Sequence, residues 1–171
     1  VGTEGGMVNF GRPWTTRPLA IKLHCRYTTS NIDIIGKKMP PGVTLTKADH
    51  DRAQIKVALG TWDYRTYGGS KDSPVHINTT DASTFVDFSK DPCTIANGDL
   101  IIHKDGYILN GASLVDASTW EWAEYTIPLN YRDLETLPTH IIVSCAASQY
   151  GDYFTGCSSS KLWIDAVELI Y

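Results

Sequence analysis

The sequence predicts an all-β fold of the sandwich or barrel kind, and three observations support this prediction. Several segments alternate polar and apolar residues with the period of two that a half-buried strand requires. Short apolar segments recur between clusters of Gly, Pro, Asn and Asp, as they do in antiparallel sandwiches and barrels. Along the 171 residues, we find no apolar stripe with the 3.6-residue period of a helix.

The first strands are predicted in the N-terminal third of the chain. Residues 1–11 are Gly-rich and predict a loose lead-in or a short edge strand, and the prolines of 12–18 favour an extended, irregular segment. In 19–28, alternation assigns one face to Ile21, Leu23, Cys25 and Tyr27, and the other face to Lys22, His24 and Arg26. The next strand is 52–61, with one face made of Ile55, Val57 and Leu59.

The connections between the strands are predicted from their lack of period. Residues 29–51 read as a long loop, a kind that is either functional or mobile. Residues 62–73 read as a polar and aromatic loop, followed by short segments at 75–78, 85–88, 99–103 and around Ala112. Two single-turn helices are candidates, at 47–52 and 133–137.

Three long strands complete the C-terminal part. Residues 120–131 alternate, and the segments 139–148 and 161–171 stand on either side of the loop SQYGDYFTG (148–156). We expect one domain over 1–171, with the lead-in at 1–11 and the sandwich at 12–171, because the length suits one compact unit.

Charge and hydropathy exclude several classes of partner. The formal net charge is −4, from 15 basic and 19 acidic residues, and there is no run of four basic residues, so nucleic acid is not expected. No apolar stretch approaches the roughly 18 residues that span a bilayer, and residues 1–7 lack the features of a signal peptide. An uncharged partner and a monomeric chain fit this composition best.

Four cysteines, at 25, 93, 145 and 157, show no CxxC spacing, which argues against a zinc site. Cys145 and Cys157 bracket the 148–156 loop, and a disulfide between them would stabilise it by about 3 kcal/mol. Buried free thiols are the alternative, and the sequence leaves both open.

Several segments together resemble a known family. They are GRPWTTRP, the first strand ending in CRY, the pattern WxxYTIPLxY and, above all, the tail IIVSCAASQYGDYFTGCSSSKLWIDAVELIY. The chain over about residues 9–171 resembles the "Putative carbohydrate metabolism domain" (PCMD) family of Bacteroidetes. Cys145 and Cys157 depart from the small residues usual in that family. The positions that match in the tail are Gly151, Asp152, Phe154, Thr155, Gly156, Ser160, Leu162, Ile164, Asp165, Leu169 and Tyr171.

The resemblance implies a jelly-roll β-sandwich of two antiparallel sheets, similar to a carbohydrate-binding module. It also implies a secreted, outer-surface or periplasmic protein of a Gram-negative bacterium, with a role related to sugars. An oxidising compartment of this kind is compatible with a disulfide.

A sugar site needs flat aromatic faces together with acids, amides or guanidinium groups for the hydroxyls. The 62–67 segment, WDYRTY, has this composition, so Trp62 and Tyr64 are candidate contacts, or they cap one end of the core. Trp120 and Trp122 share a face with Glu124 and could line a groove. The favoured alternative is that Trp122 packs inside and Trp120 lies at the edge, because large apolar residues on an alternating strand are usually buried.

Four other positions are singled out. Arg17 could hold a carboxylate, either of Asp152 or of a sugar acid, although a structural ion pair is the more frequent use of such a residue. Tyr153 could project from the 148–156 loop to a ligand, while the loop itself is expected to be a structural turn. Asp165 interrupts an apolar strand, and the resemblance to jelly-roll modules implies that it could ligate a structural calcium ion; no other cofactor is expected.

These observations lead to a ranking of functions. The favoured function is a non-catalytic module that binds oligo- or polysaccharide through Arg17, Trp62, Tyr64, Trp120 and Tyr153. The second is a glycoside hydrolase with Glu124 or Asp152 as acid or nucleophile, although no known catalytic motif occurs. The third is a structural or adhesive module of a surface assembly.

Overall fold

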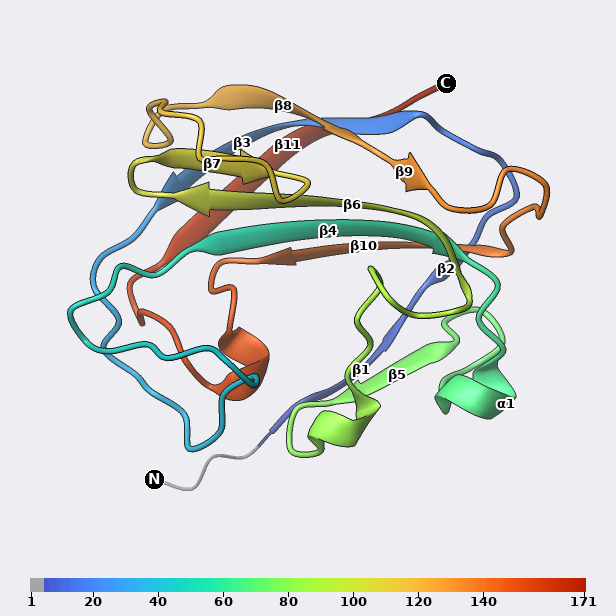
Figure 1. The fold of residues 1–171 in the computed structure, drawn as a ribbon, viewed down its shortest axis with the longest axis horizontal. Coiled ribbons are helices and arrows are strands. Elements are labelled where there is room, and N and C mark those ends of the chain that lie inside the picture. Colours follow the sequence, from blue (N-terminus) through green and yellow to red (C-terminus); the bar gives the residue numbers. More distant parts are fainter. Residues whose placement is uncertain (1–4) are drawn as a thin grey trace.

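The structure is a computed structural model that describes residues 5–171, and it consists of three layers (Figure 1). The top layer in this view is a three-stranded antiparallel sheet with the order β11-β3-β8. Its strands are β3 (Ala20–Thr28), β8 (Ala123–Pro128) and β11 (Lys161–Ile170).

The middle layer is a six-stranded antiparallel sheet with the order β2-β10-β4-β6-β7, in which β9 also pairs with β6 (Figure 1). These two sheets are not closed into a barrel, so the predicted β-sandwich is confirmed. The strands of the middle sheet are β2 (Arg12–Pro13), β4 (Ala53–Gly60), β6 (Thr94–His103), β7 (Gly106–Leu109), β9 (Asn130–Tyr131) and β10 (His140–Ala146).

The bottom layer is irregular and was not predicted as a layer. Its two-stranded ribbon pairs β1 with β5, so part of the predicted lead-in is an edge strand. Short helices and loops surround the ribbon on the far side of the middle sheet (Figure 1). Its elements are β1 (Met7–Phe10), α1 (Tyr64–Tyr67), β5 (Val75–Asn78), the 3-10 turn η1 (Ala82–Thr84) and the 3-10 turn η2 (Gly151–Tyr153).

The main core lies between the two sheets, and the alternation of the sequence accounts for it. The predicted inward faces of β3 and β4 are both buried there, and they meet Leu100 and Ile102 of β6 and Tyr125 and Ile127 of β8. Tyr27 is almost fully buried, and its hydroxyl donates a hydrogen bond to the carbonyl oxygen of Ala147 (3.0 Å). Burial raises the pKa of Tyr27 to about 12.

A second, smaller core joins the middle sheet to the bottom layer. It is built from Ala58, Trp62, Val75 and Ile142. Trp62 packs edge-to-face on Phe88, with ring centroids 5.6 Å apart, and its indole N–H donates to the carboxylate of Asp91 (3.1 Å). The bottom layer is therefore attached to the sheet through a buried aromatic side chain.

The loop that carries the GDYFTG motif is held by a buried carboxylate. Asp51 is only 3% exposed, and it accepts hydrogen bonds from the hydroxyls of Ser148 (2.5 Å) and Ser160 (2.8 Å) and from the backbone N–H of Cys157 (2.8 Å). At Gly156, a Cβ atom would clash with the Ser148 hydroxyl and lie 3.1 Å from Asp51, so the position needs glycine. The glycines and serines of the tail thus form one hydrogen-bonded unit.

Several predictions of local structure were wrong. Residues 47–52 and 133–137 form turns and bends, and 85–88 form a loop and the start of a turn. The helix that does form is α1, inside the predicted aromatic loop. Asp63 caps its N-terminus through the backbone N–H of Arg65 (2.9 Å), and Gly68 ends it with φ of 76°. Among the described residues, no helix is long and apolar enough to cross a membrane.

Candidate functional site

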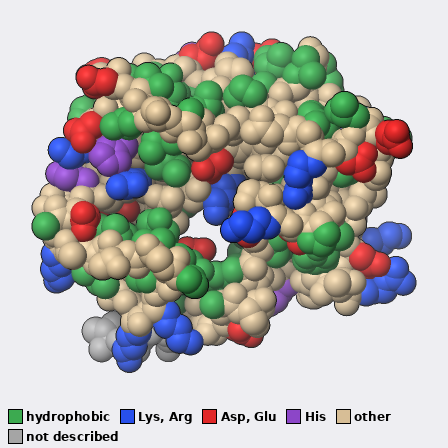
Figure 2. Space-filling view, viewed as in Figure 1, with side chains coloured by type: hydrophobic (Ala, Val, Ile, Leu, Met, Phe, Trp, Pro, Cys, Tyr) green, Lys and Arg blue, Asp and Glu red, His purple; other side chains and the backbone are tan. Residues whose placement is uncertain are grey.

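A cavity of about 490 Å³ lies between the middle sheet and the bottom layer. Its floor is the outer face of β4 and β6, and its walls are η2 and the segment 82–89. Figure 2 shows the molecule hollowed near the centre of the view, with basic and acidic side chains around the opening. An adjoining hollow of about 300 Å³ shares Gln54, Lys56 and Asp152 with it, so the two form one continuous site.

The floor is polar because the same alternation that buries one face of β4 exposes the other. Gln54 and Lys56 lie on this outer face, and in the strand register Lys56 stands opposite Asp99 of β6. The side-chain amide of Gln54 donates to the carboxylate of Asp99 (2.8 Å). A cation, an amide and a carboxylate therefore lie side by side across two strands.

Two carboxyl groups of the cavity are partly desolvated. Burial raises the pKa of Asp99 above its ordinary value, and a hydrogen bond from Gln54 and the charge of Lys56 oppose that shift. Burial likewise raises the pKa of Asp152, which comes from η2 in the other layer, and Lys56 again opposes the shift. Lys56 thus acts electrostatically on two acids that the chain brings from separate layers.

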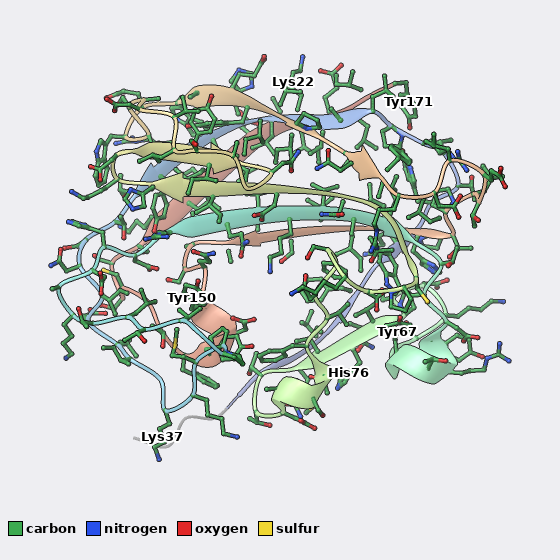
Figure 3. All side chains as sticks on the ribbon, in the orientation of Figure 1. Lys22, Lys37, Tyr67, His76, Tyr150 and Tyr171 are labelled. Carbon is green, nitrogen blue, oxygen red and sulfur yellow. The ribbon has the colours of Figure 1, made fainter. Side chains whose placement is uncertain are left out.

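The wall of the cavity is aromatic. The rings of Phe85 and Tyr153 meet edge-to-face, with centroids 5.1 Å apart and planes at 87°. Tyr150 also lines the cavity, and Figure 3 shows it beside η2 in the bottom layer. The side-chain oxygen Oε1 of Gln149 is buried and has no hydrogen-bond partner among residues 5–171. A buried acceptor of this kind favours a donor from a ligand or from water.

The raised pKa values predict a pH dependence of stability. A carboxyl group whose pKa is raised in the folded state stabilises the folded protein most at pH values below its ordinary pKa. This stabilisation is lost as the pH rises through the pKa of the folded state. We therefore expect Asp99→Asn to gain stability relative to the unsubstituted protein as the pH rises from about 4 to about 7. Urea unfolding at several pH values measures this difference, and exposed Asp72→Asn is the control. A difference that does not change with pH would contradict the prediction.

The structure brings two of the predicted residues, Asp152 and Tyr153, into the cavity. Trp62 is 2% exposed and belongs to the second core, so its predicted contact with a ligand was wrong and its alternative role in the core is the one observed. Tyr64 is exposed on α1, where the guanidinium of Arg65 lies 6.0 Å from its ring centroid. Tyr64 is not among the residues that line the cavity.

Arg17 has a structural role of a kind that was not predicted. Its guanidinium group donates to the backbone carbonyl oxygens of Leu134 and Thr136, so it holds the 133–137 loop and is not paired with Asp152.

Trp122 was expected to pack inside with Trp120 at the edge, and the expectation for Trp122 was wrong, because Trp122 is 51% exposed and Trp120 is 39% exposed. They precede β8, whose inward positions are Tyr125 and Ile127. Glu124 also points outward, where it faces His24 at 3.6 Å. Glu124 and Asp152 therefore lie on opposite sides of the two sheets and cannot act on one bond.

Two further predictions concern Asp165 and the cysteines. Asp165 is exposed at a bulge of β11, where its carboxylate accepts from the backbone N–H of Ala166 (2.8 Å), so the argument from burial was wrong. Within residues 5–171, we find no group of three or more His, Cys, Asp or Glu side chains that could hold a metal ion.

All four cysteines are free, so the Cys145–Cys157 disulfide is absent. Cys157 is buried beside the Asp51 cluster, while Cys145 lies on β10 near Cys25. Burial, with Cys145 adding to it, raises the pKa of the Cys25 thiol to about 12.

Sequence reasoning missed the floor of the site. Lys56, Gln54 and Asp99 were not singled out, although the alternation of 52–61 already places the first two on the face opposite the core. The available signal was that Gln54 and Lys56 share the polar face of one predicted strand, and that Asp99 begins another predicted strand, 99–103. Phe85 and Gln149 carried no such signal, because they come from loops.

The fold and the site define a β-sandwich with a polar, aromatic-walled cavity outside its main core. Residues 2–170 match the family described as "Putative carbohydrate metabolism domain" (PCMD), and the chain belongs to this family. No curated protein matches the chain.

Two solved structures share the fold. One is described as a "putative glycoside hydrolase" from Bacteroides thetaiotaomicron VPI-5482, with a TM-score of 0.60 and 18% identity over 96% of this chain and 41% of that chain. The other is described in the same words and comes from Bacteroides vulgatus ATCC 8482. Its TM-score is 0.56, at 16% identity over 95% of this chain and 56% of that chain. The present chain thus spans about half the length of these neighbours, and the likeness at this identity concerns the fold.

Proposed function

We propose that the chain is a non-catalytic module that binds a glycan, and that the cavity around Lys56 receives one or a few sugar units. The observation that carries this proposal is the composition of the cavity: a polar floor with donors and acceptors, an aromatic wall, and an unpartnered buried oxygen on Gln149. Sugar recognition uses this combination, because hydroxyl groups need paired hydrogen bonds while the ring faces pack on aromatic surfaces.

The family supports a sugar-related role, and the family resemblance supports a secreted or outer-surface location in a Gram-negative bacterium. Lys56 is offset by Asp99 and Asp152, so the cavity offers no unopposed positive charge for a strongly anionic sugar. A neutral glycan therefore fits the site best.

The test begins with a panel of host and plant polysaccharides in affinity electrophoresis, followed by calorimetry with oligosaccharides of the retained polymer. We expect Tyr153→Ala to weaken oligosaccharide binding about tenfold, which corresponds to about 1.4 kcal/mol. Tyr64→Ala is the matched control, because Tyr64 is a partly exposed tyrosine of the same layer outside the cavity. Equal affinity of the Tyr153→Ala variant and the unsubstituted protein would contradict the proposal.

A glycoside hydrolase is the second candidate, and one specific observation favours it. Asp99 and Asp152 are two carboxyl groups with raised pKa values in the same cavity, and hydrolysis needs one carboxyl group that stays protonated beside a second that is ionised. This pair replaces Glu124 and Asp152 of the sequence prediction. Release of reducing ends in the same panel, lost in Asp99→Asn and Asp152→Asn while binding survives, would favour the hydrolase. No retention and no release would favour the structural or adhesive role.

A further inference from the structure

A second surface with chemistry of its own lies on the opposite side of the molecule from the cavity. Trp163 lies on the outer face of the β11-β3-β8 sheet and is 39% exposed, and Trp120 and Trp122, in the segment that leads into β8, are 39% and 51% exposed. Figure 3 shows Lys22 of this sheet pointing up and away from the other layers, whereas Tyr150 of the cavity lies in the bottom layer. The two surfaces are thus separated by both sheets of the sandwich (Figure 1).

Strand pairing places Trp163 of β11 directly beside Arg26 of β3, and the guanidinium carbon of Arg26 lies 5.3 Å from the Trp163 ring centroid. On the other side of β3, the pairing with β8 ends at Cys25 and Ala123, and Trp122 directly precedes this last pair. The backbone N–H of Tyr27 donates to the carbonyl oxygen of Thr119 (3.1 Å), so the segment 119–122 runs beside the end of β3.

Arg26 also contacts the segment that leads into β8. Its Nε donates a hydrogen bond to the backbone carbonyl oxygen of Trp120 (2.6 Å), which fixes the segment that leads into β8. An arginine stacked on one indole and bonded to the backbone beside another limits the freedom of both aromatic positions. The face is therefore organised before any partner binds.

The charges of the face neutralise one another. Lys22 pairs with Glu168 at 2.8 Å and approaches Glu124 at 4.0 Å, and His24 lies 3.6 Å from Glu124. This face therefore offers a strongly charged polymer no unpaired charge to bind. A dry protein interface would have to desolvate these paired charges, which costs several kcal/mol per ion, whereas a hydrated polysaccharide leaves them in contact with water.

We propose that this tryptophan platform, defined by Trp122, Trp163 and Arg26, binds an extended neutral polysaccharide. The indole faces contact the apolar faces of sugar rings, and the paired polar side chains around them bond to hydroxyl groups. The platform is independent of the cavity, which receives chain ends or short oligosaccharides in the proposed function. Its exposed tryptophans can meet the side of a long or insoluble chain.

The test is a depletion assay with the whole 171-residue chain on three insoluble polysaccharides: microcrystalline cellulose, starch granules and mannan. We expect retention on at least one of them, with a decrease of at least tenfold in apparent affinity for the Trp122→Ala/Trp163→Ala double variant. The Leu134→Ala/Leu137→Ala variant is the matched control, because it removes two exposed apolar side chains from a loop outside the platform. Thermal unfolding confirms that each variant is folded.

A spectroscopic readout locates the contact. Acrylamide quenches the fluorescence of exposed tryptophans more than that of buried Trp62. A soluble fragment of the retained polysaccharide should therefore reduce acrylamide quenching in the unsubstituted protein and leave it unchanged in the double variant. Tyr64→Ala, which lies outside both surfaces, should bind the insoluble polymer like the unsubstituted protein, whereas Tyr153→Ala tests the cavity separately through its affinity for the oligosaccharide.

Three results would overturn the proposal. They are unchanged retention of the double variant, no retention of the unsubstituted protein on any of the three polymers, and a concentration-dependent dimer that the double variant abolishes. The last result would assign the platform to a second copy of the chain.

Discussion

Asp51→Ala is expected to lower the free energy of unfolding by about 4 kcal/mol, because it removes the acceptor shared by four hydrogen bonds. The hydroxyls of Ser148 and Ser160 and the backbone N–H groups of Cys157 and Arg52 all donate to this carboxylate. The N–H of Cys157 is buried and cannot turn to another acceptor. For a chain of this length, the loss corresponds to a decrease in melting temperature of about 8 to 16 °C.

Chemical denaturation of Asp51→Ala, Asp51→Asn and Asp33→Ala measures this effect. Asp51→Asn keeps one acceptor oxygen and should lose less stability than alanine. Asp33 bonds to the backbone and side chain of Ser158 in the same region, but it is exposed, so its replacement should cost about 1 kcal/mol or less. If Asp51→Ala and Asp33→Ala were equally stable, the hydrogen-bonded unit around Asp51 would not be a principal support of the tail.

Trp62→Ala is the second substitution with a large expected effect, and it should lower the free energy of unfolding by about 3 to 5 kcal/mol. The indole is 2% exposed, packs on Phe88 and donates to Asp91, so its removal leaves a cavity and an acceptor that has lost one donor. Tyr67 also donates to Asp91 (2.8 Å), and burial raises the pKa of Tyr67. The substitution therefore loosens the attachment of the bottom layer to the middle sheet.

Urea unfolding measures the stability of Trp62→Ala, and calorimetry with the oligosaccharide measures its function below the melting transition. Trp62→Phe is the matched variant, since it keeps an aromatic ring and removes the donor, and it should lose less stability than alanine. Neither variant is expected to change a direct contact with sugar. A strong loss of binding at unchanged stability would return Trp62 to the role of a ligand contact.

Regular alternation made the faces of β3 and β4 predictable. In β3, every second side chain from Ile21 to Tyr27 is buried, as the period of two requires. The same reasoning failed before β8, because Trp120 and Trp122 lie outside the paired strand on an uncovered face. Apolar character alone does not tell which side of a three-stranded sheet is covered, since this depends on where the second sheet packs.

Local turn chemistry was predictable only in part. The 133–137 segment has an acidic first turn, but its backbone is held by Arg17 from a distant part of the chain, and no helix forms. The 63–68 segment contains both an Asp cap and a terminal glycine for one helical turn, and that turn does form. A single turn has too few internal hydrogen bonds to be stable alone, so tertiary contacts decide the outcome.

The sequence by itself determined the β-sandwich class, the buried faces of its first long strands and the family to which the chain belongs, because these depend on short-range periodicity and on motifs. Only the tertiary structure decided that Trp62 is buried, that Tyr153 and Asp152 line the same cavity as Lys56 and Asp99, and that Arg26 stacks on Trp163. The physical reason is that a site is made by side chains from separate strands and loops. Their meeting depends on strand register and on how the layers pack, and neither leaves a local pattern in the chain.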